Sequence, residues 1–418
     1  MTVSEDFQLG ADFARALDAG DPLARFRGRF AALSGRIYLQ ANGLGLASRE
    51  AEAAVEAALA AWKQRAHRGW EEGEQPWLTA ERLGALQAPL VGAAADEVVA
   101  TGTTTQNLHV LLATFYRPAG RRTKILADEL NFPSDVFALQ SQVRLRGLDP
   151  AEHLVLVKSR DGRMLEEDDV VAAMTDEITV LVLPSAIYRS AQVLDVAGLT
   201  RAAHERGILA GFDLSHSIGI TPHALDRWDV DFAFWCGYKW LNGGPGAVGG
   251  LYVNRRHFGR RAGMTGWFGV APARQFDPDL VYEQAPTARA WCLSTPHVLS
   301  AAALEGALGV FHEASGAPTA SAARRSSSSS TTPTCRSDSA RASWCWHAAA
   351  CWPPARPTPS RAIRAWSRPT SVAEPLLNVR GLAAGYGPLG SSTASTWMSA
   401  GATCWRSWAP MAPASRRS

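Results

Sequence analysis

One lysine stands out chemically in this chain of 418 residues. The sequence contains 38 Arg but only four Lys, which are Lys63, Lys124, Lys158 and Lys239. Lys239 lies between Trp-Cys-Gly-Tyr and Trp-Leu-Asn-Gly-Gly-Pro-Gly, in a segment rich in aromatic residues and glycine. An amine can lose its proton and condense with a carbonyl group, which a guanidinium cannot do. Lys239 is therefore a candidate for covalent chemistry, although a surface lysine that follows a strand would look the same.

A carboxylate precedes this lysine. Asp213 ends the run Gly-Ile-Leu-Ala-Gly-Phe-Asp, 26 residues before Lys239, and His216 follows it three residues later. This spacing leaves room for one further strand and its connection. An aspartate at a strand end is often a helix cap or a turn residue. It can also hold a heterocyclic nitrogen in its protonated form.

Two further segments could serve an anionic aromatic ligand. Three threonines at 103–105 follow Gly102, and a helix beginning there would offer them as an anion site or simply as a cap. Phe132 precedes Pro-Ser-Asp at 133–135 and could cover a ring or belong to the core. An amine, a carboxylate, a phosphate cup and an aromatic face are what pyridoxal phosphate (PLP) requires of a protein. The four features together predict a PLP site.

Alternating strands and helices must position these residues. The sequence predicts helices over 50–65, 101–115 and 196–206, the first with Val55, Leu59 and Trp62 on one face. Short apolar runs between and after them predict strands at 123–126, 153–157, 178–183, 208–212, 230–235 and 248–253. Buried strands separated by helices favour an α/β fold with a mostly parallel sheet. Ligands of such sheets bind beyond the carboxyl ends of the strands, where Asp213 and Lys239 are predicted to lie.

Composition divides the chain in two. Residues 318–418 hold twelve Arg and two acidic residues, a net charge of +10, which leaves −7 for residues 1–317. An acidic body argues against nucleic acid as a partner. Neither a secretion signal nor an apolar run long enough to span a membrane is evident, so we expect no membrane partner and a cytoplasmic location.

Seven segments within residues 1–317 resemble kynureninase, a PLP-dependent enzyme of aminotransferase class V and fold type I. They are Tyr-Leu-Gln-Ala-Asn-Gly-Leu-Gly-Leu (38–46), Thr-Thr-Gln-Asn-Leu-His (104–109), Phe-Pro-Ser-Asp (132–135), Phe-Asp-Leu-Ser-His-Ser (212–217), Trp-Cys-Gly-Tyr-Lys-Trp-Leu-Asn (235–242), Gly-Trp-Phe-Gly (266–269) and Leu-Ser-Thr-Pro (293–296). In the first segment Gly43 stands where the family usually has Ser. The resemblance implies that residues 1–60 contribute to a small domain and that residues 61–317 form the PLP-binding large domain. It also implies that the small domain is incomplete.

The resemblance also implies a role for each matched residue. Lys239 would bind PLP covalently and, with Tyr238, act in catalysis. Trp267 and Thr295 would reach the phosphate of a neighbouring subunit in a homodimer, and Trp70 would line the substrate pocket. The full set of implied cofactor-binding residues is Thr104, Thr105, Phe132, Pro133, Ser134, Asp135, Asp213, His216, Tyr238, Lys239, Trp267 and Thr295.

The implied reaction is the hydrolysis of L-kynurenine, or of 3-hydroxykynurenine, to anthranilate and L-alanine in tryptophan catabolism and NAD biosynthesis. Two alternatives remain open: another class V enzyme, such as a desulfurase or an aminotransferase, and a PLP-binding product without catalysis. A desulfurase would need a mobile catalytic cysteine, for which residues 1–317 offer Cys236 and Cys292.

Residues 318–418 show no match to the family's C-terminal segment, whose arginine binds the substrate α-carboxylate. We therefore expect impaired activity and an unstructured tail. When the codons of this tail are read in a shifted frame, they resemble coding sequence of ABC-transporter ATPases. The hypothesis is therefore that the tail is an out-of-frame reading, and the alternative is a genuine basic tail. The spacing of Cys345, His347 and Cys351 does not support a zinc site, so no metal is expected.

Overall fold

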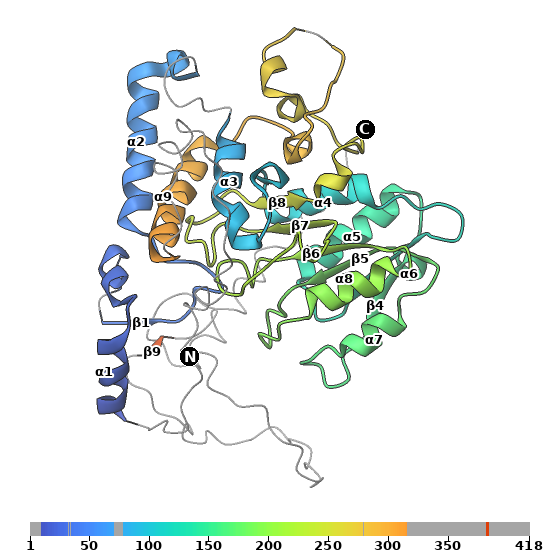
Figure 1. Cartoon of the computed structure of the whole chain (residues 1–418), viewed down its shortest axis with the longest axis horizontal. Helices are drawn as coiled ribbons and strands as arrows, with labels where there is room; N and C mark the ends of the chain where they lie inside the picture. Colours follow the sequence, from blue (N-terminus) through green and yellow to red (C-terminus); the bar gives the residue numbers. More distant parts are fainter. Residues whose placement is uncertain are drawn as a thin grey trace, which may run out of the picture. The chain divides into compact units, whose positions relative to one another are not determined.

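The computed structural model describes residues 10–31, 33, 35–70, 78–278, 280–315 and 382–383 (Figure 1). The chain forms two compact units. The first comprises residues 1–34 and 40–374, and the second comprises residues 35–39 and 375–418. In the second unit, β1 (Ile37–Tyr38) pairs in parallel with β9 (Leu382–Ala383). The candidate site lies entirely within the first unit.

A seven-stranded sheet with the order β2-β8-β7-β6-β5-β3-β4 forms the centre of the first unit. Its strands are β2 (Val98–Ala100), β3 (Lys124–Asp128), β4 (Leu154–Val157), β5 (Ile178–Pro184), β6 (Leu209–Asp213), β7 (Phe232–Trp235) and β8 (Gly250–Val253). The pairs from β4 to β7 are parallel, and β8 runs antiparallel to both β7 and β2. The prediction of a mostly parallel sheet is confirmed.

Helices cover both faces of this sheet. The α-helices are α1 (Ala11–Gly20), α2 (Arg49–Arg65), α3 (Thr79–Val91), α4 (Thr104–Phe115), α5 (Pro133–Leu145), α6 (Pro150–His153), α7 (Glu167–Ala172), α8 (Val196–His204) and α9 (Val298–Ser315). The 3-10 helices are η1 (Ala24–Arg29), η2 (Ala66–Trp70), η4 (Ala95–Glu97), η5 (Arg255–His257), η6 (Trp267–Gly269), η7 (Pro272–Arg274) and η8 (Ala288–Trp291). Helices α4 and α5 contact one face of the sheet, whereas α3 and α8 contact the other.

Side chains alternate along β5 between two core layers, as the pleat of a strand requires. Val180 and Val182 pack with the residues of α4 and α5, while Leu181 and Leu183 pack with those of α3 and α8. All four are fully buried. Because both faces are covered, the strands read in the sequence as continuous apolar runs, which is why they could be predicted.

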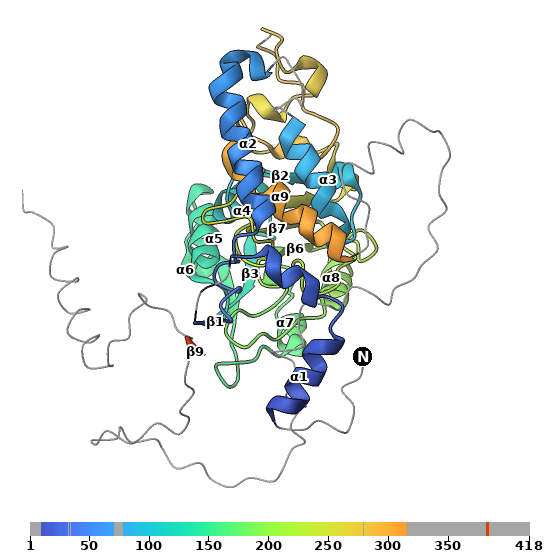
Figure 2. The same ribbon diagram turned by 90° about the vertical axis from the view of Figure 1, so that its left-hand side faces the viewer.

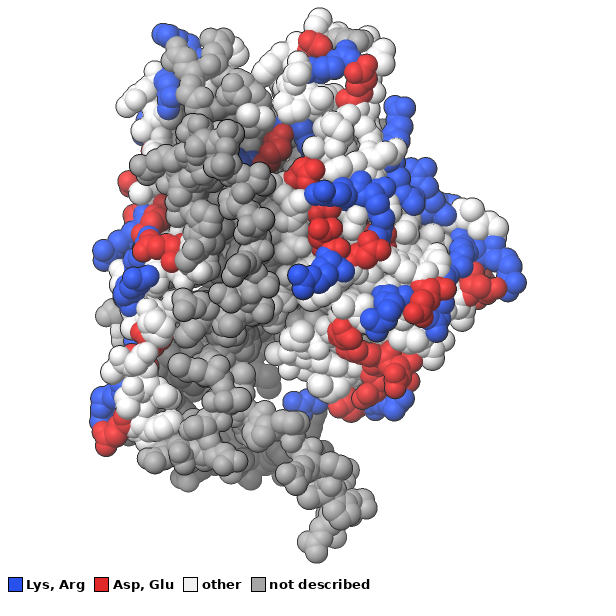
Figure 3. All heavy atoms as spheres, in the orientation of Figure 1, with Lys and Arg blue, Asp and Glu red and all other residues white. Residues whose placement is uncertain are grey.

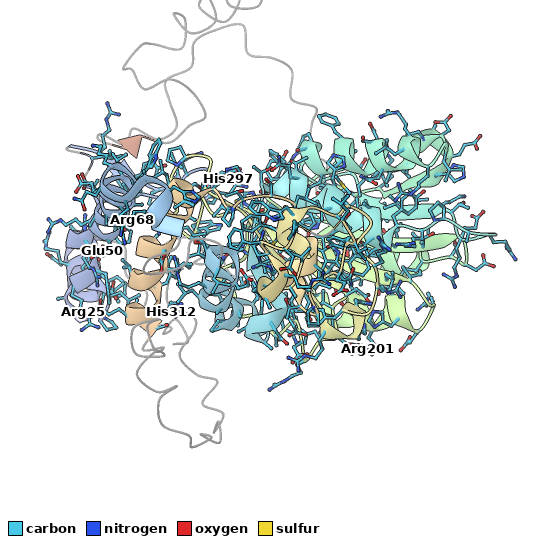
Figure 4. All side chains as sticks on the ribbon, turned by 90° about the horizontal axis from the view of Figure 1, so that it is seen from above. Arg25, Glu50, Arg68, Arg201, His297 and His312 are labelled. Carbon is cyan, nitrogen blue, oxygen red and sulfur yellow. The ribbon has the colours of Figure 1, made fainter. Side chains whose placement is uncertain are left out.

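Helix α2 lies beside α9 in both ribbon views (Figure 2). Ser48 caps α2 by accepting a hydrogen bond from Ala51 N (3.1 Å), and Arg29 Nε donates to Glu50 (2.6 Å) on its first turn. His312 Nε2 on α9 lies 2.8 Å from Leu86 O, which ties α9 to α3. Glu50 and His312 are labelled in Figure 4 on the two neighbouring helices.

The sequence predicted most of these elements but not all their details. Helices 50–65 and 196–206 and the six predicted strands correspond to elements of the structure within a few residues. Of the three residues predicted to share one face of 50–65, Trp62 is 66% exposed. Strand β2 was not predicted. The predicted unstructured tail lies outside the described residues, apart from β9.

The surface of the described residues carries both signs of charge. On the face shown in Figure 3, Lys and Arg side chains are interspersed with Asp and Glu. In the described part of the chain, no helix has the length and apolar character that crossing a membrane demands.

Candidate active site

Parallel strands bring the predicted residues to one edge of the sheet. Asp128 is the last residue of β3 and Asp213 is the last residue of β6. The turn that carries Lys239 follows the end of β7 at Trp235. These strands end on the same side because β3, β5, β6 and β7 are parallel neighbours.

The amine of Lys239 lies in a polar and aromatic cluster. Its Nζ is 2.7 Å from Nε2 of His216, and the residue is only 8% exposed. The same nitrogen lies 5.6 Å from the centre of the Phe132 ring and 5.7 Å from that of Tyr238. The structure thus brings together four residues that the sequence analysis singled out separately.

Close backbone contacts hold the turn that carries this lysine. A Cβ atom on Gly237 would lie 2.4 Å from Val248 O, and one on Gly45 would lie 2.3 Å from Lys239 O. Gly45 N also donates to Tyr238 O over 2.8 Å. The Asn-Gly-Leu-Gly-Leu segment at 42–46 therefore packs against the lysine turn, where glycine is required at position 45.

Two buried carboxyl groups, Asp213 and Asp135, interact electrostatically with Lys239, and a third, Asp128, interacts with Asp135. Asp213 is buried, accepts from Ser215 N (2.8 Å), and lies within hydrogen-bonding reach of Asp135, the first-turn acid of α5. Burial raises the pKa of Asp213, although the charge of Lys239 opposes this. Burial, and then the charge of Asp213, raise the pKa of Asp135 well above its usual range. Burial raises the pKa of Asp128 to about 7.

The neighbours of Lys239 are held in their neutral forms. Burial, together with the charge of Lys239, lowers the pKa of His216 to about 3, so the imidazole is uncharged at neutral pH. Its Nε2 can then accept a hydrogen bond from the lysine amine. Burial raises the pKa of Tyr238 to about 12, with Cys236 and Asp213 as further causes, so this phenol keeps its proton.

Two helix N-termini meet beside the cluster. The side chain of Thr103 caps α4 through Gln106 N (3.4 Å). Among the described residues, the backbone N–H groups of Thr104 and Thr105 have no hydrogen-bond partner. Thr105 Oγ1 lies 2.7 Å from Ser134 Oγ in the first turn of α5. Hydroxyl and N–H groups at helix N-termini form an anion site.

The carboxyl, N–H and aromatic groups of this cluster match the chemical groups of PLP. Oδ2 of Asp135 is buried without a hydrogen-bond partner, and two adjacent buried carboxyl groups need a cation or a shared proton. A protonated ring nitrogen would supply that cation to Asp213 and Asp135. The free N–H groups of Thr104 and Thr105 would receive a phosphate, and the face of Phe132, which is 43% exposed, would receive a ring.

The structure does not join every predicted residue to this cluster. Trp267 is half exposed, and its Nε1 donates to Gln275 O (2.6 Å). Within the described residues, neither Trp267 nor Thr295 forms a hydrogen bond with the Lys239 cluster. The side chain of Trp70 lies outside the described residues. Pro133 occupies the first position of α5, which its fixed φ angle suits.

Sequence reasoning missed Tyr188 in the loop after β5. Its ring meets the Phe132 ring edge-on at 5.4 Å and the His216 ring at 6.0 Å. Its position shortly after a buried strand was the available signal. The nearby Ser185 is buried, and its hydroxyl is engaged with Asp213 O (3.0 Å) and Ser217 Oγ (2.5 Å).

This fold and cluster define a class of enzyme. The family model for aminotransferase class-V matches residues 37–327. A cystine C-S lyase in complex with cysteine persulfide shares the fold, with a TM-score of 0.58 and 18% identity, over 69% of this chain and 74% of that one. A cysteine desulfurase from Thermococcus onnurineus NA1 also does so, with a TM-score of 0.58 and 18% identity, over 69% and 70%. The protein is a class V aminotransferase-fold protein.

Sequence relatives narrow this class. Kynureninase from Geobacillus thermodenitrificans strain NG80-2 is 54% identical over 304 residues, which are 72% of this chain and 71% of the relative. Kynureninase from Bacillus anthracis is 55% identical over 311 residues, which are 74% and 73% of the two chains. The chain therefore belongs to the kynureninase family, as its motifs predicted, and PLP is the cofactor of that family.

Proposed function

We propose that this protein hydrolyses L-kynurenine, or its 3-hydroxy derivative, to anthranilate and L-alanine. One observation carries the proposal. The Lys239 amine lies 2.7 Å from a neutral imidazole, and among the described residues no ion pair joins the buried acids of the cluster, Asp213 and Asp135, to an arginine or histidine. The likeness to named kynureninases supports the choice of substrate.

When bound, PLP supplies an electrophilic carbonyl carbon and a protonated ring that spreads the negative charge developing on the substrate. Lys239 holds the position from which an amine can remove a proton from the substrate α-carbon. His216 orients that amine through Nε2. Asp213 and Asp135 would hold the ring nitrogen in its protonated form.

Tyr238 is suited to donate a proton to the β-carbon when the carbon–carbon bond breaks. Its pKa of about 12 keeps the phenol protonated at neutral pH, and the residue directly precedes Lys239. A general acid must carry its proton at the working pH and lie within reach of the reacting carbon. A hydrated γ-carbonyl supplies the other product, a carboxylic acid.

The proposal also covers the oligomeric state of the protein. The substrate is a small molecule, and the active unit is a homodimer in which Trp267 and Thr295 serve the neighbouring site. The half-exposed Trp267 and its exposed neighbour Phe276, whose rings lie 5.9 Å apart, are consistent with an interface there. We also propose that Trp70 contacts the substrate and that residues 61–317 form the PLP-binding domain.

Cofactor binding and turnover test the proposal separately. The protein is titrated with PLP, reduced with borohydride and mapped by mass spectrometry, and anthranilate fluorescence then follows the hydrolysis of kynurenine. We expect PLP on Lys239 and fluorescence that Lys239→Ala abolishes. Lys158→Ala, at an exposed lysine paired with Glu129, is the matched control. PLP attached elsewhere, or no release of anthranilate, would contradict the proposal.

A cysteine desulfurase is the second candidate, because two solved structures with this fold carry related activities. The two cysteines of the described residues do not suit it. Cys236 and Cys292 are both buried, and burial raises the pKa of each thiol, that of Cys292 to about 12. Sulfide release from L-cysteine, without anthranilate from kynurenine, would favour this candidate. PLP binding without either product would indicate a non-catalytic protein.

A further inference from the structure

A chain of hydrogen bonds connects the end of β6 to a histidine that the proposed mechanism does not use. Ser185 Oγ lies 3.0 Å from Asp213 O and 2.5 Å from Ser217 Oγ. Ser217 Oγ in turn lies 3.0 Å from Nε2 of His223, in the loop between β6 and β7. Both serines are fully buried, so these contacts must satisfy their hydroxyl groups.

Only one direction of donation makes all three contacts hydrogen bonds. A hydroxyl group has a single hydrogen to donate. If Ser185 donates to Asp213 O, then Ser217 must donate to Ser185. Ser217 can then only accept at its contact with His223. The imidazole therefore carries its hydrogen on Nε2 and is the first donor of the chain.

Thr221 independently places the hydrogen on Nε2. Thr221 Oγ1 donates to Ser217 O (3.1 Å), so at its contact with His223 Nε2 (3.2 Å) it can only accept. Burial lowers the pKa of His223 to about 4, so the imidazole is uncharged at neutral pH and carries one hydrogen. Among the described residues its Nδ1 is buried without a hydrogen-bond partner, and an unpaired lone pair there costs less than an unpaired N–H would.

The chain ends on the residue whose carboxyl group is assigned to the ring nitrogen of PLP. Asp213 O accepts from both the backbone N–H and the hydroxyl group of Ser185, over 2.9 and 3.0 Å. The carboxyl group of Asp213 accepts from Ser215 N (2.8 Å). Hydrogen bonds that run in one direction strengthen one another. The donor at His223 therefore helps to fix the last residue of β6 through its main chain.

We propose that His223 is a positioning residue for the cofactor. Through Ser217 and Ser185 it holds the backbone of Asp213, and thereby the carboxyl group that would face the ring nitrogen. The inference rests on the proposed function, which assigns Asp213 to that nitrogen. Loss of the His223 donor should weaken the contact with the nitrogen, and leave the contacts with the phosphate and the ring face unchanged.

An analogue of PLP in which a C–H group replaces the ring nitrogen tests this positioning. The full-length protein is titrated with PLP and with the analogue, and binding is read from the absorbance of each ligand. We expect His223→Leu to weaken PLP binding about 3- to 10-fold, the usual contribution of one neutral hydrogen bond, and to leave binding of the analogue unchanged. His223→Gln, whose amide group can still donate to Ser217, should recover the affinity for PLP.

His312 on α9, labelled in Figure 4, is the matched control. Burial lowers its pKa too, its Nε2 lies 2.8 Å from Leu86 O, and its Nδ1 is buried without a partner among the described residues. His312→Leu should cost stability but keep the preference for PLP over the analogue. Equal weakening of both ligands by His223→Leu, or no weakening of either, would overturn the inference. A wild-type protein that binds both ligands equally would instead refute the role of Asp213 in the proposed function, and the inference with it.

A second measurement needs no cofactor. In cofactor-free protein, the ring N–H signal that His223→Leu removes is assigned to one of the two nitrogens by NMR. A hydrogen on Nε2, with a signal that shifts in Ser185→Ala, supports the chain. A hydrogen on Nδ1, or a signal that Ser185→Ala leaves unmoved, contradicts it.

Discussion

The Nζ atom of Lys239 and the Nε2 atom of His216 lie 2.7 Å apart, although 23 residues separate them in the sequence. Lys239 follows β7 and His216 follows β6, so the parallel pairing of these strands creates the contact. Because burial holds the imidazole neutral, with a pKa of about 3, its Nε2 can accept a hydrogen bond from the amine when the ring hydrogen sits on Nδ1.

Removing this acceptor should slow the reaction. We expect His216→Phe to reduce kcat/KM for kynurenine about 10- to 100-fold, the usual cost of losing a group that orients a reactive side chain. His216→Gln should recover part of the loss, because its amide oxygen can still accept. Anthranilate fluorescence provides the measurement. His153→Phe, in the short helix α6 away from the cluster, should behave as wild type, and equal activity of the two His216 variants would contradict the orienting role.

Asp128 should make the folded state less stable as pH rises. Its pKa is about 7 in the folded protein and near 3.8 when unfolded, so between these values the folded state holds a proton that the unfolded state has lost. Stability is therefore fully present below about pH 4 and falls by about 1.4 kcal/mol per pH unit up to about pH 7. Asp128→Asn cannot ionise, so urea unfolding should show its advantage over wild type growing from pH 5 to pH 8.

An exposed aspartate supplies the control of opposite sign. Backbone hydrogen bonds from Met164 and Arg163 lower the pKa of Asp161. Its contribution to stability is present above its unfolded pKa and disappears as pH falls. Asp161→Asn should therefore lose more stability relative to wild type at pH 8 than in strong acid. Identical pH profiles for the Asp128 and Asp161 variants would refute the assignment of the slope to Asp128.

The chemistry-bearing residues could be predicted because they follow buried parallel strands. Continuous apolar runs mark such strands, and the first polar residue after each run lies at the ligand-binding edge, as Asp213 does. This rule fails where the apolar run ends before the strand does. The apolar run at β3 predicts a strand end at residue 126, but the strand continues to Asp128, a buried carboxyl that no hydrophobic pattern can indicate.

Contacts between distant loops could not be predicted from the sequence. Tyr188 contacts Phe132 across 56 positions, and its place after a buried strand does not indicate which ring it will meet. Strand β2 has only three residues and is defined by its pairing with β8. Helical periodicity predicted that Val55, Leu59 and Trp62 share a face of α2. It does not show whether another element covers that face, and Trp62 is exposed.

The two glycines of α9 should respond to alanine in opposite directions. A Cβ atom on Gly306 would lie 2.3 Å from Glu50 O on α2, so Gly306→Ala must push the helices apart, at about 1–3 kcal/mol. Nothing lies within 4 Å of a Cβ atom on Gly309, so Gly309→Ala should stabilise the helix by about 0.5–1 kcal/mol. Thermal unfolding of the two variants measures both, and a shift of the same sign in each would contradict the close packing of α2 on α9.

A buried ion pair beside η8 should be the most sensitive electrostatic contact. The guanidinium of Arg289, whose side chain is 1% exposed, donates to Glu81 on α3 and, through Nε, to Val270 O (2.8 Å). Glu81→Ala removes this carboxylate from a buried guanidinium, and the loss of one partner of a buried ion pair costs about 3–5 kcal/mol. The urea midpoint should fall accordingly. Asp169→Ala, which breaks the exposed pair with Arg160 (2.7 Å), leaves a cation in water and should have a far smaller effect. Equal losses in the two variants would mean that water reaches Arg289, and the segment from Val270 to Arg289 would then be less firmly anchored to α3 than the structure shows.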